Sequence, residues 1–507
     1  MNLAHLLNRS SRLYPEFPAL FRGEEKVATY AELAVRVAGL AGSLKGTFKL
    51  QPGDRVALAM NNTTEFVEVL FASWHAGLVA VPMNPRLHAR ELAYILDHSG
   101  ARVCFATNDL AEIIAPLLSE LPGLERLISV NEPDYVKLRS EPPVEIVERL
   151  ATDGAWLFYT SGTTGRPKGA ELSHRNLLTM TCGYFVDYER VSPGNRILHI
   201  GPMCHGSGLY ILPHIAGGAA QVVPTRGFSP EEVFALIERH PGTSFFAAPT
   251  IVKRLAESQE ARSANVTNVR TIVYGGAPMY VEDLKRALAC FGPKLAQVYG
   301  QGETPMAISV LSKADHVDSE NPAFEARLNS VGVAQSIVDV RIVDSEDRTL
   351  PPGELGEVLV RGDTVMKGYW NNPDATKETL RGGWLHTGDV AVMDESGFIT
   401  LKDRNKDVII SGGSNIYPRE VEEILLRHPA VAEASVVGKA DSKWGESVVA
   451  FVACVPGQTV GPDELDALCI QNIARYKRPK SYIFIEAMPK SHLGKVLKTE
   501  LRLLLKD

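Results

Sequence analysis

Residues 159–170 of this chain read YTSGTTGRPKGA and directly follow the apolar run AWLF at 155–158. Glycine allows backbone angles that side chains forbid, so N–H groups can approach an anion, while hydroxyls and a lysine add donors and charge. The residues that we expect to hold phosphate are Thr160, Ser161, Gly162, Thr163, Thr164, Gly165 and Lys168. A loop of this kind after an apolar strand predicts a nucleotide triphosphate site.

The loop differs from the common phosphate-binding loop, in which a lysine directly follows a glycine and precedes a serine or threonine. Here Pro167 precedes Lys168, and Gly169 follows it. A flexible Gly/Ser linker is the alternative, but such linkers lack a Pro-Lys pair and rarely lie between a strand and a helix-like segment. The loop therefore indicates a polyphosphate site of a different kind.

Length and composition are those of a globular protein with more than one domain. At 507 residues, 45% of them hydrophobic, the chain exceeds what one core usually serves. A net charge of −7 argues against a general binder of nucleic acids or anionic membranes, whose contact faces are basic. We expect no nucleic-acid partner and no integral membrane segment, since no apolar run reaches the roughly 18 residues of a span.

The cysteines and the N-terminus indicate the compartment. Six cysteines without a C-x-x-C pair, and without a Cys/His cluster at metal spacing, are typical of free thiols in a reducing environment. The N-terminus MNLAHLLNRSSRLYP lacks a basic-then-apolar signal pattern. We therefore expect a cytoplasmic protein without disulfides or structural zinc.

Helical and strand patterns alternate over most of the chain. Residues 29–44 and 65–77 have the periodicity of helices, and 55–60 has that of a strand. This alternation resumes after the glycine-rich loop and predicts an α/β fold with helix-covered, mostly parallel sheets. Over 331–405 the pattern changes to antiparallel strands joined by turns, which predicts a small β-barrel-like subdomain. Beyond the charged segment 402–406 the pattern returns to mixed α and β.

Four further segments carry side chains suited to a nucleotide. In YGQGE, at a strand exit, Tyr299 could stack on a base and Glu303 could hold a magnesium ion. Asp389 in TGD can accept two ribose hydroxyls, and Arg404 can reach sugar or phosphate. Lys495 follows a glycine near the C-terminus. Taken alone, each of these residues could be an ordinary turn, cap or surface residue.

In this order and spacing, SGTTGRPKG, YGQGE, TGD, DRNKD-x-I-x-SGG and GK-x-x-K resemble the motifs of the adenylate-forming superfamily. Within it the chain is similar to acyl-CoA synthetases with the firefly-luciferase-like fold, over nearly its full length. The resemblance implies a large N-terminal domain, 1–405, whose part 331–405 is the β-rich subdomain. It also implies a small, mobile α+β C-terminal domain, 406–507.

The resemblance implies a two-step reaction. A carboxylate attacks the α-phosphate of Mg·ATP to give acyl-AMP and pyrophosphate, and the thiol of coenzyme A then displaces AMP. Because the first step brings two anions together, positioning and cationic or N–H stabilisation carry most of the catalysis. By resemblance, Lys495 bridges the acyl carboxylate and the α-phosphate, His205 lies beside that carboxylate, and Glu303 holds the magnesium.

The same resemblance assigns the remaining nucleotide and coenzyme contacts. Gly276, Ala277 and Tyr299 flank the adenine, while Asp389 and Arg404 bind the ribose. The small domain of this family is believed to rotate between the half-reactions about a hinge two residues after the arginine, which makes Lys406 the hinge. Rotation would bring Ser411, Gly412 and Gly413 to the site, where small residues leave room for a pantetheine arm.

The chain departs from the family pattern at two motifs. Gly302 stands where a threonine usually donates to the α-phosphate, and Thr304 comes just after Glu303. Leu493 and Lys498 stand where serine and arginine are common. Lys495 itself is kept, so adenylation is still implied. Which group replaces the missing threonine stays open.

The acyl pocket should be formed by residues that follow His205 and by two strand ends. Its candidates are Gly206, Ser207, Tyr210, Tyr274, Met306 and Ile308. None is charged, so a dicarboxylic acid would lack a partner for its second carboxylate. We expect a monocarboxylic acid with an apolar tail, a medium- or long-chain fatty acid first and a benzoate- or cinnamate-type acid as the alternative. Small Gly206 and Ser207 should leave space for it.

Two other functions remain alternatives. A free-standing acyl-AMP ligase would load a carrier protein instead of coenzyme A, and a regulator would bind the nucleotide without catalysis. The presence of Glu303, Asp389 and Lys495 argues against a regulator. We expect a carboxylic acid, ATP and coenzyme A as small-molecule partners, magnesium as the metal, and keep a homodimer as a candidate assembly.

Overall fold

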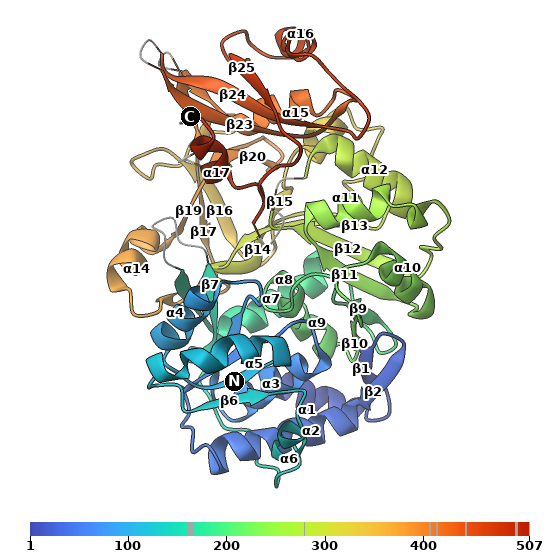
Figure 1. Ribbon diagram of the computed structural model, residues 1–507, viewed down its shortest axis with the longest axis vertical. Helices are drawn as coiled ribbons and strands as arrows, with labels where there is room; N and C mark the ends of the chain where they lie inside the picture. Colours follow the sequence, from blue (N-terminus) through green and yellow to red (C-terminus); the bar gives the residue numbers. More distant parts are fainter. Residues whose placement is uncertain are drawn as a thin grey trace.

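The computed structural model describes residues 1–160, 167–277, 279–404, 407–411, 414–441, 444–491 and 495–505, without the side chains of 403, 404, 414 and 415. In this part of the chain the strands form four sheets, and helices pack on the two large ones (Figure 1). No helix in it is long and apolar enough to cross a membrane. The predicted α/β class with mostly parallel sheets is confirmed.

The first large sheet has the strand order β18-β8-β7-β4-β3-β5-β6, and its pairs are parallel except β7-β8 and β8-β18. Its strands are β3 (Arg55–Ala59), β4 (Val79–Met83), β5 (Ala101–Ala106), β6 (Arg126–Ser129), β7 (Gly154–Thr160), β8 (Lys168–Ser173) and β18 (Gly368–Tyr369). The N-terminal helices are α1 (Ala4–Leu13), α2 (Tyr30–Gly46), α3 (Thr64–His75), α4 (Ala89–Ser99), α5 (Asn108–Ile114), the 3-10 helix Ala115–Glu120 and α6 (Pro133–Leu138).

Helices bury this sheet on both faces. Val56 and Leu58 of β3 pack in one core with α2 and α3, whereas Ala57, between them, packs in another with α4 and α5. Successive strand residues point to opposite faces, so a strand buried on both sides is apolar throughout. This is why the strand pattern at 55–60 was unbroken in the sequence.

The second large sheet has the order β15-β14-β13-β12-β11-β9-β10-β1-β2 and is parallel from β1 to β13. Its strands are β1 (Pro18–Arg22), β2 (Glu25–Thr29), β9 (Arg196–Leu198), β10 (Ala220–Val223), β11 (Thr243–Ala247), β12 (Val269–Gly275), β13 (Leu295–Gln301), β14 (Thr304–Leu311) and β15 (Val333–Ala334). Its helices are α7 (His174–Asp187), α8 (Gly206–Leu209), α9 (Ile211–Ala216), α10 (Pro230–Arg239), α11 (Pro249–Glu257), the 3-10 helix Glu260–Arg262, α12 (Val281–Phe291) and α13 (Phe324–Leu328).

The two faces of this sheet have different neighbours. Tyr274 of β12 packs with residues of α10, α11 and α12, whereas the preceding Val273 packs with Tyr184 of α7 and with Tyr210. We call the first the outer face and the second the inner face. Helix α7 starts with a capping box of Ser173 and Asn176, a pairing that satisfies exposed N–H groups.

The segment from 331 to 405 contains the predicted antiparallel strands, which form a half-barrel in the order β16-β17-β19-β20. Its elements are β16 (Asp339–Val343), β17 (Leu355–Arg361), α14 (Pro373–Thr379), the 3-10 helix Arg381–Gly383, β19 (Leu385–Met393) and β20 (Ile399–Arg404). Strand β20 continues into the charged segment 402–406 as far as Arg404, because its last residues pair with β19 as far as Asp389.

The C-terminal part is a smaller mixed sheet with helices, as the sequence predicted. Its elements are β21 (Ile409–Ser411), β22 (Ser414–Ile416), α15 (Pro418–Leu425), β23 (Val431–Asp441), β24 (Gly445–Cys454), α16 (Pro462–Asn472), β25 (Ser481–Phe484) and α17 (Lys498–Leu503). Helix α15 has its own core with β23 and β24, and it also contacts the rest of the molecule.

Helix α15 docks on the segment that follows β12. The buried Arg419 donates from Nη2 to the Met279 carbonyl over 3.4 Å and to Asn329 Oδ1 over 3.5 Å. One turn along, Glu423 Oε1 lies 3.8 Å from Arg419 Nε. Burial raises the pKa of Glu423, and the Arg419 charge opposes that rise. The buried Arg419 thus joins α15 to this segment, and the half-buried Glu423 of the same helix lies beside its charge.

We expect Arg419→Met to destabilise the protein by about 3–5 kcal/mol, because it removes the hydrogen bonds to Met279 and Asn329 and leaves the half-buried Glu423 carboxylate without its cation. Arg419→Met combined with Glu423→Gln should recover about 1–3 kcal/mol of that loss, the usual coupling of paired groups. Urea unfolding of both single variants and the double variant measures this. Strictly additive losses would show that the two side chains do not stabilise each other.

Candidate active site

Strands β7 and β8 hold the two ends of the glycine-rich loop. Thr160, the last residue of β7, and Lys168, the first of β8, are partners across the antiparallel pair. Five predicted phosphate ligands lie outside the described residues, namely Ser161, Gly162, Thr163, Thr164 and Gly165. Of the predicted phosphate cradle, the structure thus describes the two strand ends, Thr160 and Lys168, which lie opposite each other.

Tyr369 of β18 connects Lys168 to Glu303. Its ring centroid lies 5.0 Å from Lys168 Nζ, and its hydroxyl donates to Glu303 Oε1 over 2.7 Å. Burial, and after it the Glu303 charge, raises the pKa of Tyr369, so the phenol stays protonated and remains a donor. The structure therefore brings the phosphate candidate and the magnesium candidate together. Tyr369 could not be predicted from the sequence, because no spacing relates β18 to the loop.

Asp389 is held by two neutral donors. Its Oδ2 accepts from the Tyr299 hydroxyl over 2.7 Å and from Gln301 Nε2 over 2.7 Å. Asp389 is buried, and in the β19-β20 pair its partner is Arg404, whose side chain lies outside the described part. The predicted base and ribose residues, Tyr299 and Asp389, are thus in direct contact. Gln301 is a further residue of this hydrogen-bonded group, and its role could not be predicted from the sequence.

Gly302 is packed too tightly to carry the threonine of the family pattern. A Cβ at this position would press on Thr160 Cγ2 and would lie 2.8 Å from Phe158 Cδ1. Thr304 does not supply the missing hydroxyl, because its buried Oγ1 donates to the Ala307 carbonyl over 3.1 Å and lies 2.9 Å from Thr364 Oγ1. Close packing against β7 thus explains why a glycine stands here.

His205 is half-buried and neutral at physiological pH. Burial lowers the pKa of His205 to about 4. Its Nδ1 lies 3.0 Å from Cys204 Sγ, and its ring packs edge-on against Phe158 with centroids 5.4 Å apart. A neutral imidazole can orient a carboxylate by hydrogen bonding but contributes no positive charge. The cation that offsets two anions must then come from another residue.

Asn62 positions the loop in front of His205, a role that the sequence did not suggest. Its Nδ2 donates to the carbonyls of His199 and Gly201 over 2.9 and 2.8 Å, and its Oδ1 accepts from Met203 N over 2.9 Å. One asparagine, on the loop that follows β3, therefore forms hydrogen bonds with three backbone groups of the loop in front of His205.

Five of the six acyl-pocket candidates divide into three groups in the structure. Gly206, Tyr210 and Met306 lie at one aromatic cluster on the inner face of the second sheet, which also contains Phe246. Tyr274 lies on the outer face, where its hydroxyl is 2.8 Å from His316 Nε2. Ile308 packs into the core of the half-barrel.

The space expected beside Gly206 and Ser207 is already occupied. A Cβ on Gly206 would lie 2.6 Å from Phe246 Cε1. Ser207 is fully buried, and its Oγ lies 2.8 Å from Nδ1 of the buried His199. Glycine at 206 therefore allows a phenylalanine edge to approach, instead of leaving an open channel at this point.

The predicted adenine segment meets helix α15. Gly276 has φ +84°, a conformation that favours glycine, and Ala277 follows it. Three residues after Ala277, the Tyr280 hydroxyl donates to Glu422 Oε2 over 3.0 Å. The C-terminal part thus contacts the chain directly beyond the adenine candidates.

The C-terminal candidates are partly described. Lys495 is exposed, and its backbone closes a short turn in which Ser491 N donates to the Lys495 carbonyl over 2.7 Å. Ser411 pairs with Gly445 of β24. Lys406, Gly412 and Gly413 lie outside the described residues.

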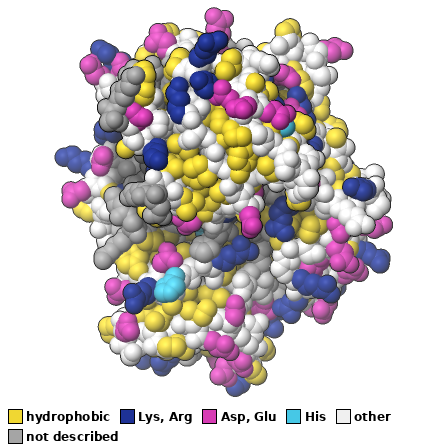
Figure 2. Space-filling view, turned by 45° about the horizontal axis from the view of Figure 1, so that its top comes forward, with side chains coloured by type: hydrophobic (Ala, Val, Ile, Leu, Met, Phe, Trp, Pro, Cys, Tyr) yellow, Lys and Arg dark blue, Asp and Glu magenta, His cyan; other side chains and the backbone are white. Residues whose placement is uncertain are grey.

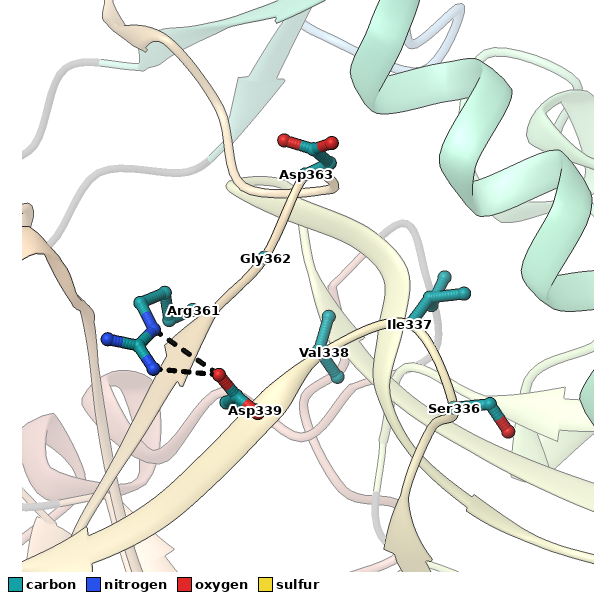
Figure 3. Close-up of a pocket in the computed structure, with 7 residues that line it drawn as sticks. All are labelled: Ser336, Ile337, Val338, Asp339, Arg361, Gly362 and Asp363. Carbon is teal, nitrogen blue, oxygen red and sulfur yellow. Dashed lines mark hydrogen bonds and ion pairs between the residues drawn. The ribbon is translucent and has the colours of Figure 1, made fainter.

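A polar hollow of about 530 Å³ between β16 and β17 contains none of these candidates. Figure 3 shows Arg361 and Asp339 paired across it, with Arg361 Nη2 and Asp339 Oδ2 2.9 Å apart. Each charge already has its partner, so we assign no ligand there. On the face drawn in Figure 2, positive and negative side chains are interspersed around apolar patches.

Comparison with known families identifies two matching regions. Residues 7–370 match the family described as AMP-binding enzyme, and residues 420–495 match the AMP-binding enzyme C-terminal domain. Together these regions include both large sheets and most of the C-terminal part.

Individual relatives match over nearly the whole chain. A feruloyl-CoA synthase of Amycolatopsis sp is 39% identical over 97% of both chains. A fatty acid–[acyl-carrier-protein] ligase of Streptomyces coeruleorubidus is 34% identical over 96% of this chain and 93% of its own length. A medium/long-chain fatty acid–CoA ligase of Mycobacterium tuberculosis is 31% identical over 98% and 89%. ATP-bound MatB from Rhodopseudomonas palustris superposes with a TM-score of 0.89 at 28% identity, covering 100% of this chain and 99% of that chain.

We expect Gly302→Ala to cost about 1–3 kcal/mol of stability and to raise the KM for ATP, because the new methyl group displaces Thr160. Thr160→Ser keeps the hydroxyl but removes the Cγ2 atom that collides. The double variant should therefore recover part of both losses. Urea unfolding and pyrophosphate release at varied ATP measure them, and an equal loss in single and double variants would contradict the packing argument.

Proposed function

Because the chain belongs to the AMP-binding enzymes, and is an AMP-forming acid–thiol ligase of that family, we propose that it joins a monocarboxylic acid with an apolar tail to coenzyme A through acyl-AMP. One observation carries this proposal. Two carboxylates, Glu303 and Asp389, project from different sheets beside the ends of the glycine-rich loop, and neutral donors orient both. This arrangement suits a nucleotide with its metal.

Both substrates of the first step are anions. The step therefore needs positive charge beside them more than it needs a base. An oxygen of the acid forms a bond to the α-phosphorus while the bond to the bridging oxygen of pyrophosphate breaks. Thr160 and Lys168 bind the phosphates, and Asp389 accepts from the ribose hydroxyls. Neutral His205 orients the acid by a hydrogen bond. Lys495 supplies the positive charge that offsets the two anions.

The second step transfers the acyl group. The coenzyme A sulfur forms a bond to the acyl carbon, and the carbon–oxygen bond to AMP breaks, so AMP leaves with the electron pair. We assign Lys406 as the hinge that exchanges Lys495 for the segment with Ser411, Gly412 and Gly413, which contacts the pantetheine arm. Small residues there keep the approach of the thiol narrow and dry.

Magnesium fits the Glu303 position. Mg²⁺ prefers hard oxygen ligands and uses one or two protein carboxylates, completing its shell with phosphate and water. Among the described residues no group of three His, Cys, Asp or Glu forms a closed metal cage. When bound, the ion would offset charge on the phosphates. Tyr369 would hold the Glu303 carboxylate in place through its hydrogen bond.

A carrier protein is the second candidate acceptor. The relative from Streptomyces coeruleorubidus is a fatty acid–[acyl-carrier-protein] ligase and matches nearly the whole chain. It would use the same adenylation step, so only the acceptor of the acyl group distinguishes the two functions. The relatives include both a feruloyl-CoA synthase and a fatty acid–CoA ligase, so their names do not distinguish an aromatic acid from a fatty acid.

Incubation of the pure protein with ATP, Mg²⁺ and a panel of fatty, benzoic and cinnamic acids tests the proposal. We expect pyrophosphate release with at least one class of acid, and formation of AMP and acyl-CoA once coenzyme A is added. Transfer to a holo-carrier protein but not to coenzyme A would favour the second candidate. No pyrophosphate release with any acid would disprove both.

We predict that Lys495→Ala lowers the rate of adenylation by about 10²–10³-fold, the range found when one stabilising group at a developing charge is removed. Thioester formation from pre-made acyl-AMP should stay within about threefold of wild type, since Lys495 acts in the first step only. Pyrophosphate release and single-turnover thioester formation measure the two steps. Lys26→Ala, on the distant strand β2, serves as the matched control, and equal losses in both steps would contradict the assigned role.

A further inference from the structure

Glu422 of α15 is a buried carboxylate that joins three separate segments of the chain. Its Oε2 accepts a hydrogen bond from the Tyr280 hydroxyl over 3.0 Å, and its Oε1 accepts from Val436 N of β23 over 2.8 Å. The same Oε1 lies 3.1 Å from Lys498 Nζ, at the start of α17. One side chain thus links the C-terminal sheet, the helix that follows Lys495, and the segment beyond the adenine candidates.

Lys498 fixes one end of the turn that carries Lys495. Leu497 N donates to the Pro489 carbonyl over 2.8 Å, which closes the base of this turn. Lys498 is the next residue, and its ion pair with Glu422 attaches the turn to α15. The side chains of this pair are only 18% and 5% exposed, so water and salt screen it less than a surface pair.

The Tyr280 hydroxyl is the partner that comes from the other part of the chain. Tyr280 lies on the segment after β12, three residues beyond Ala277, whereas Glu422 belongs to the C-terminal part. Burial, and after it the Glu422 charge, raises the pKa of Tyr280, so the phenol keeps its proton and remains a donor. Arg419, three residues before Glu422 on the same face of α15, reaches the Met279 carbonyl. The contact of Tyr280 with Glu422 therefore exists only while α15 is docked on this segment.

A lysine at position 498 leaves the second oxygen of Glu422 to Tyr280. An arginine is common at this position in the family, and its planar guanidinium often binds both oxygens of a carboxylate at once. The ammonium of a lysine is a point charge that needs only one of them, and here it lies beside Oε1. The departure from the family pattern at Lys498 thus matches the tyrosine at 280.

We propose that Glu422 is a positioning residue for Lys495. Lys498 stands in place of the usual arginine so that Glu422 can hold Tyr280 at the same time. Through these two partners, Glu422 sets the Lys495 turn against the segment that follows the adenine candidates. This inference rests on the proposed two-step ligase function and concerns the first step, in which Lys495 acts. Rotation about Lys406 separates Glu422 from Tyr280, so the contact does not serve thioester formation.

The test measures both half-reactions in Tyr280→Phe, with the acid of the panel that gives the fastest pyrophosphate release. We expect adenylation to fall about tenfold, the effect of losing one hydrogen bond to a charged group. Single-turnover thioester formation from pre-made acyl-AMP should stay within about threefold of wild type.

Lys498→Arg tests why a lysine is found at this position. It should slow adenylation about as much as Tyr280→Phe, because the guanidinium takes Oε2 of Glu422 from the tyrosine. The double variant should be no slower than either single variant, since both changes remove the same contact. The same two assays measure all three variants.

Tyr135→Phe is the matched control. The Tyr135 hydroxyl donates to Oε2 of the buried Glu68 over 2.8 Å, and Glu68 also pairs with Arg139 at 3.1 Å. The control therefore removes the same kind of hydrogen bond, but from helices that cover the first large sheet. It should lower the thermal midpoint of unfolding and keep the wild-type ratio of the two half-reaction rates.

Tryptic cleavage after Lys402 reports the docking of α15 without any substrate. Lys402 is half-buried in β20; burial lowers its pKa, and the charge of Glu420 on α15 opposes that change. Undocking of α15 exposes this site to the protease. We expect Tyr280→Phe and Lys498→Arg to be cleaved here about tenfold faster than wild type, and Tyr135→Phe at the wild-type rate. Mass spectrometry of the fragments identifies the cleavage after Lys402.

Three outcomes would overturn the inference while the ligase function stands. They are equal losses in both half-reactions of Tyr280→Phe, additive losses in the double variant, and a wild-type rate of cleavage in Tyr280→Phe. Absence of pyrophosphate release from wild type with every acid would instead contradict the proposed function, and the cleavage rates would then still test the contact between Glu422 and Tyr280.

Discussion

The antiparallel hairpin of β13 and β14 is the constraint on which the site depends. It carries Tyr299, Gln301, Glu303 and Met306. The first two reach the ribose candidate on β19, the third reaches β18, and the fourth reaches the aromatic cluster on the inner face. Two glycines permit this close packing of the hairpin against its neighbours. A Cβ at 300 would press on the Met306 backbone, and one at 302 would press on Thr160.

The electrostatics of the site follow from the donors that surround its carboxylates. Among the described contacts, a phenol and an amide donate to Asp389, and a phenol donates to Glu303. A neutral donor orients a carboxylate without cancelling its charge, so both remain able to bind a ribose or a metal ion. His205, the candidate for contact with the acid, is neutral as well, because burial lowers its pKa. In the proposed mechanism, Lys168 and Lys495 supply the positive charge that acts on the phosphates.

Much of the architecture could be predicted from the sequence because each pattern is local. Unbroken apolar runs indicate strands buried on both faces, and the strands expected near 55–60 and in 331–405 are present. Contacts between distant segments could not be predicted. Tyr369 and Asn62 act through pairs far apart in the chain, and no periodicity marks them. The pair of Arg419 and Glu423 resembles an ordinary exposed helix pair until α15 is docked and Arg419 is buried.

By itself, the sequence determined the family, the α/β class and the motif residues, because glycine-rich turns and strand-end carboxylates need only local geometry. The tertiary structure alone decided how these residues combine. Alternation along β12 turns Tyr274 away from Tyr210, although both were candidates for one pocket. Packing of Gly302 against Thr160 explains the missing threonine, and burial makes His205 neutral. These properties depend on which surfaces meet, and a linear pattern does not contain that information.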